Sequence, residues 1–212
     1  ISPASATNYD WFIDQLCATD KAAAERDGQS FHAVLAREIE RAYSSPSSLM
    51  YHPYLFGSPH GAAASASFLG LRGWHGRGDM LRAVLEGIAF NHRLHVDALR
   101  DNFQITAARL TGGISRNPLF AQLMADVLGL PVTTADTEEA AAWGAALCAG
   151  AGVGMFASPY HDPRHGGMHD RIFAPAGATT ELAERYRLHC KASRTLGSLW
   201  TELEDLASKD TP

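Results

Sequence analysis

Residues 105–134 read ITAARLTGGISRNPLFAQLMADVLGLPVTT, which predicts a strand, a glycine turn, a helix and a second strand. Asn117 and Pro118 are typical of the cap and first position of a helix, and Gly129 followed by Pro131 is typical of its end. Five apolar residues recur between these signals at helical spacing: Phe120, Leu123, Met124, Val127 and Leu128. The segment therefore predicts an α/β domain, in which strands alternate with helices.

Further elements are predicted on both sides of this segment. Periodic apolar residues predict helices at residues 8–16, 30–43, 79–100, 137–152 and 181–206. Their expected caps are Asn8, Ser30, Asp79 and Thr137. One more strand is expected at residues 49–56, and residues 160–178 read as irregular. Three strands are few for so many helices, so we expect an incomplete domain whose first strands precede Ile1.

The length, the apolar content and the net charge of the chain argue against some classes of binding partner. The 212 residues suit one domain or a domain and a half, and the 46% of apolar residues can form a core. A net charge of −5 with no basic run argues against nucleic acid as a partner. No apolar stretch is long enough to cross a membrane, and no signal peptide is evident. We expect a cytoplasmic protein with neither partner.

Cysteine and histidine patterns give no metal site. Cys17, Cys148 and Cys190 lie far apart without CxxC spacing, as expected of reduced thiols. Three histidines are spaced by four, but proline and glycines between them oppose the helix that would align them: His161, His165 and His169. His92 and His95 share a predicted helix without a carboxylate at ligand spacing. We predict no protein-borne metal site.

Chemistry is most plausible at the glycine turn that follows the strand ending at Leu110. Gly112 and Gly113 lack side chains that would bar a flat base or a ribose, and the following helix start is expected to present free N–H groups. The alternative is an ordinary strand–helix turn in which the glycines only satisfy steric needs. A second block, residues 66–86, indicates by itself only a turn before an amphipathic helix.

Four segments resemble the FGGY family of carbohydrate kinases, and their order along the chain agrees with the order in that family. Residues 66–90 (ASFLGLRGWHGRGDMLRAVLEGIAF) are similar to that family's second signature, and residues 111–132 to its adenosine-binding strand, turn and helix. Residues 138–154 (EEAAAWGAALCAGAGVG) resemble the helix that follows. Residues 50–60 (MYHPYLFGSPH) resemble a substrate-side loop, although Ser58 stands where many members have glutamate.

The resemblance implies two actin-like, ribonuclease H-like domains. Residues 1–212 would be the C-terminal, nucleotide-binding domain, and the N-terminal sugar-binding domain, which carries the general base, would be absent from this chain. No catalytic residue is therefore assigned here. ATP and Mg²⁺ are the implied cofactors. The implied nucleotide-binding residues are Gly112, Gly113, Ser115, Asn117 and, in the turn before the first helix, Asn8.

The implied function is ATP-dependent phosphorylation of a sugar, with the isolated chain inactive. Gly73-Trp74-His75 and the helix after it are similar to the ketopentose branch, such as the L-xylulose kinases. The implied partners are the sugar, ATP or ADP, the N-terminal domain and a second copy in a homodimer. A non-catalytic actin-like nucleotide-binding module is the alternative. For Glu86, a direct role and a packing role both stay open.

Overall fold

The computed structural model describes residues 6–134, 139–160, 170–177 and 179–209. The chain divides into two compact units. The larger unit contains residues 1–102 and 180–212, and the smaller unit contains residues 103–179. No helix in the described ranges combines the length and apolar character needed to cross a membrane.

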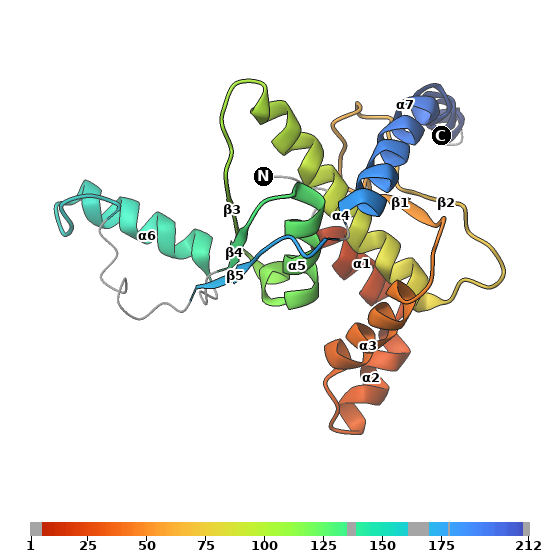
Figure 1. Ribbon diagram of the computed structural model, residues 1–212, viewed down its shortest axis with the longest axis horizontal. Helices are drawn as coiled ribbons and strands as arrows, with labels where there is room; N and C mark the ends of the chain where they lie inside the picture. The colour runs from red at the N-terminus through yellow and green to blue at the C-terminus, as the bar shows by residue number, and fades with distance from the viewer. Residues whose placement is uncertain (1–5, 135–138, 161–169, 178, 210–212) are drawn as a thin grey trace. The chain divides into compact units, whose positions relative to one another are not determined.

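The larger unit is mostly helical, with one short hairpin-like pair of strands (Figure 1). Its elements are α1 (Ala6–Leu16), α2 (Ala18–Arg26), α3 (Phe31–Tyr43), β1 (Met50–His52), β2 (Ser67–Leu69), α4 (Arg77–Arg100) and α7 (Thr179–Lys209). β1 and β2 are antiparallel, with Tyr51 opposite Phe68. The predicted strand at residues 49–56 is thus shorter than expected, because Pro53 cannot donate a ladder hydrogen bond.

Helix α4 is the centre of the larger unit. Residues 81–91 of this helix are all buried, as expected of a helix that is covered on every side. Helices α1 and α3 and strand β1 pack against it. Phe90 of α4 also contacts the rings of Tyr186 and His189 on α7, at centroid distances of 5.8 and 5.4 Å.

The larger unit confirms some expected helix starts and corrects others. Ser30 caps α3, accepting the N–H of Ala33 at 3.4 Å. Asn8 is not a cap: it lies inside α1, which begins at Ala6. Asp79 is not a cap either, since α4 begins two residues earlier, and its carboxylate accepts the N–H of the cap residue Gly76 at 2.8 Å. Both errors arose because a residue that favours caps also serves inside the first turn.

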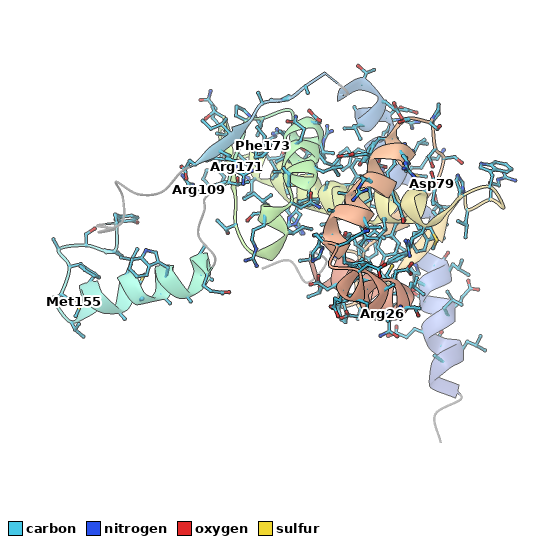
Figure 2. All side chains as sticks on the ribbon, turned by 90° about the horizontal axis from the view of Figure 1, so that it is seen from below. Arg26, Asp79, Arg109, Met155, Arg171 and Phe173 are labelled. Atoms are coloured by element: carbon cyan, nitrogen blue, oxygen red, sulfur yellow. The ribbon has the colours of Figure 1, made fainter. Side chains whose placement is uncertain are left out.

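The smaller unit is the strand–helix–strand segment with additions. Its elements are β3 (Ala108–Leu110), the 3₁₀ helix η1 (Gly113–Arg116), α5 (Pro118–Leu128), β4 (Val132–Thr134), α6 (Ala140–Gly152) and β5 (Arg171–Phe173). The strand order is β3–β4–β5, with β3 parallel and β5 antiparallel to β4. Strand β5 was not predicted. Figure 2 shows Arg109, Arg171 and Phe173 together at this sheet.

Helix α5 matches its prediction closely. It begins at Pro118 after Asn117 and ends at Gly129, which has the left-handed φ of 64°. All five residues of its predicted apolar face are buried: Phe120, Leu123, Met124, Val127 and Leu128. The expected cap Thr137 and the histidines 161, 165 and 169 lie outside the described residues. Helix α6 begins at Ala140.

The contact of α4 with β1 yields a test of the fold. A Cβ added at Gly87 would lie far inside van der Waals contact of the Tyr51 carbonyl oxygen. We expect Gly87→Ala to lower the free energy of unfolding by about 1–3 kcal/mol, measured by urea denaturation, because the backbones must separate. The control is Gly197→Ala in α7, where a Cβ meets no atom within 4 Å. That change should stabilise the helix by about 0.5–1 kcal/mol, and equal effects of both would contradict the packing.

Candidate functional site

The turn between β3 and α5 holds four of the five predicted nucleotide-binding residues. Gly112 has φ 93° and ψ 179°, a conformation that residues with a Cβ rarely adopt. Ser115 fixes the turn: its hydroxyl donates to the Gly112 carbonyl oxygen at 2.6 Å, and its backbone N–H donates to the same oxygen at 3.0 Å. The turn therefore has a defined shape set by a glycine and a serine.

The surface of the turn is open to a ligand. Gly112 and Gly113 are exposed, and no atom lies within 4 Å of a Cβ built at Gly112. At Gly113, the nearest atom to such a Cβ is Nη2 of Arg116, at 3.9 Å. A flat group could therefore approach the backbone of both glycines directly. Neighbouring protein atoms do not require small residues here, as they do at Gly87.

The start of α5 differs from the expectation of free N–H groups. The side-chain carbonyl of Asn117 accepts the N–H groups of Leu119 and Phe120 at 3.0 and 3.3 Å. The N–H of Ala121 donates to the Asn117 backbone oxygen, and Pro118 has no N–H. The prediction that this helix start presents free donors is wrong, because the asparagine that begins the helix satisfies them. These bonds leave the NH₂ group of Asn117 as a donor for a ligand.

The remaining predicted residues have polar contacts inside the protein. Ser115 is 8% exposed and already donates its hydroxyl hydrogen. Asn8 belongs to the larger unit and is fully buried, and its carbonyl accepts the Tyr51 hydroxyl at 3.0 Å. The NH₂ group of Asn8 has no hydrogen-bond partner among the described residues. A nucleotide contact by Ser115 or Asn8 stays a prediction.

Arg116 was not singled out from the sequence, yet its guanidinium lies over the turn beside Gly113. Residues 103–134 contain only one other cationic side chain, Arg109. That arginine is paired with Asp170 at 2.6 Å. The sequence signal for Arg116 was a charged residue inside a glycine turn.

Glu86 of the signature segment is a packing residue of the larger unit. Its carboxylate is 1% exposed and lies between two arginines. Arg82 donates to one oxygen at 2.8 Å, and Arg185 of α7 donates to the other at 2.9 and 2.5 Å. Of the two roles left open for Glu86, the geometry supports packing.

Both arginines also bind backbone carbonyls of the segment that joins α3 to β1. Arg82 donates to the oxygens of Ala42 and Ser45 at 2.9 Å. Arg185 donates to the oxygens of Ser47 and Leu49. The guanidinium of Arg82 also covers the Tyr43 ring, whose pKa is raised well above its ordinary value by burial. The two cations thus have partners on every side, as a buried ion pair requires.

The segment that resembles a substrate-side loop is attached to α7 by aromatic and histidine side chains. His52 and His189 are buried with ring centroids 4.4 Å apart, and Tyr54 meets Trp200 edge to face at 5.7 Å. Nε2 of His52 donates to the His189 carbonyl oxygen at 3.3 Å, so in the neutral ring Nδ1 accepts from the Ser67 hydroxyl at 3.1 Å. Burial lowers the pKa of both histidines, which favours their neutral forms.

The segment that resembles the ketopentose branch lines a hollow of about 390 Å³ in the larger unit. Trp74 is 78% exposed at its edge. The lining also includes Glu38, Arg41, Ser45, His75 and Asp79. Two of these carboxylates are engaged: Glu38 pairs with Arg77, and Asp79 accepts the Gly76 N–H. The residues that line this hollow do not include two consecutive glycines like those of the turn in the smaller unit.

The buried triad gives a test of the role of Glu86. We expect Glu86→Gln to lower the free energy of unfolding by about 3–5 kcal/mol, because two buried guanidinium groups lose their shared counter-ion. Urea denaturation measures the change. The matched control is Glu184→Gln, which breaks the exposed pair with Arg187 and should leave the midpoint unchanged. A Glu86→Gln midpoint equal to that of the parent chain would contradict the packing role.

Comparison with known proteins supports the predicted family. The model of the FGGY family of carbohydrate kinases, C-terminal domain, matches residues 2–153. The L-xylulose/3-keto-L-gulonate kinase of Escherichia coli (strain K12) is 30% identical over 168 residues, which are 77% of this chain and 32% of that protein. A glycerol kinase of Gloeobacter violaceus is 43% identical over 103 residues, 47% of this chain and 21% of that protein.

Solved structures agree on the fold. A xylulose kinase from Rhodospirillum rubrum superposes with a TM-score of 0.68 at 28% identity, covering 92% of this chain and 38% of that one. A ligand-bound xylulose kinase from Lactobacillus acidophilus gives 0.69 at 22% identity, covering 93% and 39%. The chain spans about a third of the length of the curated relatives it matches. It has the α/β, actin-like fold, and because the family model covers well over half of its residues, this chain belongs to the FGGY family of carbohydrate kinases.

Proposed function

We propose that this chain supplies the nucleotide-binding half of an ATP-dependent kinase that phosphorylates a ketopentose. The observation that carries the proposal is the open turn at Gly112 and Gly113, within the part of the chain that the family model matches. Several relatives are named for xylulose or L-xylulose, which supports the ketopentose. Ser58 stands where many family members have a glutamate in the substrate-side loop, so the identity of the sugar has to be measured.

In this proposal, the adenosine part of the nucleotide lies on the two glycines. Asn117 reads the base with its NH₂ group, because its carbonyl oxygen is held by the α5 N–H groups. A group that only donates pairs with the acceptor nitrogens of an adenine ring and not with its amino group. Ser115 then acts mainly by holding the turn in shape, with its oxygen left to accept one further bond.

Phosphoryl transfer depends on positioning and on neutralising charge. Mg²⁺, when bound, would neutralise and bridge the phosphates of ATP. Within the described residues no group of three or more histidine, cysteine or acidic side chains could hold a metal. Mg²⁺ that binds together with a nucleotide usually keeps several waters and is held by the phosphates and one or two carboxylates. The general base and most sugar contacts are assigned to the N-terminal domain, and closure of the two domains would exclude water.

The compartment and the oligomeric state that we propose rest on the same family membership. We assign the activity to the cytoplasm and to a protein that pairs with a second copy of itself. The alternative function is a non-catalytic actin-like module that binds nucleotide without transferring phosphate. The open glycine turn is compatible with both functions, so turnover has to separate them.

ADP release by the longer protein that contains this chain tests the function directly. A panel of ketopentoses, polyols and glycerol should give turnover with one ketopentose in the presence of ATP and Mg²⁺. The 212-residue chain alone should give none. Nucleotide binding without turnover on any sugar would favour the non-catalytic module.

Gly113→Val tests the site within that function. A Cβ at Gly113 meets no atom closer than 3.9 Å and the residue has no positive φ, so the variant should fold. Its side chain would fill the space of the nucleotide, and we expect ADP affinity to fall by more than about tenfold, a loss of at least about 1.4 kcal/mol. Calorimetric titration measures it. Gly73→Val, in equally open space, is the control. Unchanged ADP affinity in Gly113→Val would reject the site.

A further inference from the structure

The start of α5 cannot hold a phosphate in the usual way. A helix start binds anions through N–H groups that lack partners within the helix. Here Leu119 and Phe120 donate to the Asn117 side chain, Ala121 donates to the Asn117 backbone, and Pro118 has no N–H. A nucleotide's phosphates would therefore find no free N–H group among residues 119–121.

Arg116 has the position and the freedom to balance the charge of a nucleotide's phosphates. It is the last residue of η1, its side chain is exposed, and its Nη2 lies 3.9 Å from a Cβ built at Gly113. Among the residues that the structure describes, no carboxylate pairs with it, whereas Arg109 is held by Asp170 through bonds of 2.6 and 3.4 Å. Within the described part of the chain, Arg116 is thus a cation without an ion-pair partner, and it lies beside an open turn.

We propose that Arg116 binds a phosphate of the nucleotide at the turn formed by residues 111–117. This inference rests on the proposed function, and it adds to it the residue that distinguishes a nucleoside diphosphate or triphosphate from a nucleoside. A guanidinium matches two phosphate oxygens at once and stays charged at any relevant pH. Its location over Gly113 keeps it within reach of a ligand seated on the glycines.

The chemistry favours phosphate over the base as the group that Arg116 contacts. A guanidinium can also stack on a purine, but stacking would leave the phosphates without a cation from this turn. With the α5 donors occupied, Arg116 supplies the only cationic side chain in residues 111–134. The two roles predict different ligand dependence, because adenosine has the purine and no phosphate.

Calorimetric titration of the chain with ADP and with adenosine separates these roles. We expect Arg116→Gln to weaken ADP binding at least about tenfold, as for loss of a charge-assisted bond, and to leave adenosine affinity within about twofold. Arg116→Lys keeps the charge without the bidentate geometry and should fall between Gln and the parent chain. The matched control is Arg109→Gln, which removes the same charge from the same unit and should change neither affinity.

The outcomes are distinct. Equal losses for ADP and adenosine in Arg116→Gln would assign the arginine to the base or to the shape of the turn and would overturn the proposal. Unchanged ADP affinity would also overturn it, while leaving the proposed nucleotide site intact. If the parent chain binds neither ligand, the proposed function fails together with this inference. Retained adenosine binding in Arg116→Gln also shows that the variant is folded.

Discussion

A single buried carboxylate links helices α4 and α7 in the larger unit. Glu86 lies on the central helix α4 and is shared by Arg82, four residues earlier, and Arg185, 99 residues later on α7. Removing three charges from water is costly, and it is tolerated only where every donor finds an acceptor. The backbone oxygens of residues 42–49 complete that set.

Two consequences follow for the rest of the larger unit. The segment between α3 and β1 is fixed by side chains from α4 and α7, so β1 is presented to Gly87 at the close distance that only glycine permits. The same attachment brings α7 against β1, where His52, Tyr54, His189 and Trp200 meet. His52 and Tyr54 belong to the segment that resembles the family's substrate-side loop, so this cluster attaches the segment to α7.

Local signals in the sequence were enough for some elements and not for others. Helix α5 was predicted from its cap to its final glycine, because asparagine, proline and glycine act there through their own backbone geometry. Asp79 was misplaced, since its side chain bonds three residues back and marks the first turn instead of the cap. Helix α2 and strand β5 had no comparable signal: α2 has no apolar stripe of its own, and β5 pairs with a strand nearly 40 residues earlier.

The site shows the same division. The two glycines and Asn117 could be singled out because each acts within its own turn. The occupied donors of α5 and the position of Arg116 needed three-dimensional geometry, as did the burial of Asn8 and Glu86. Family membership links the turn to carbohydrate kinases, and the curated relatives are about three times as long as this chain.

Amide chemical shifts of the isotope-labelled chain, recorded while ADP is added, would test the central claim that the turn at residues 111–117 receives the nucleotide. The largest and saturable changes should fall on the backbone amides of Gly112, Gly113 and their neighbours up to Asn117. Changes centred instead on the hollow beside Trp74, or no saturable change anywhere, would contradict it.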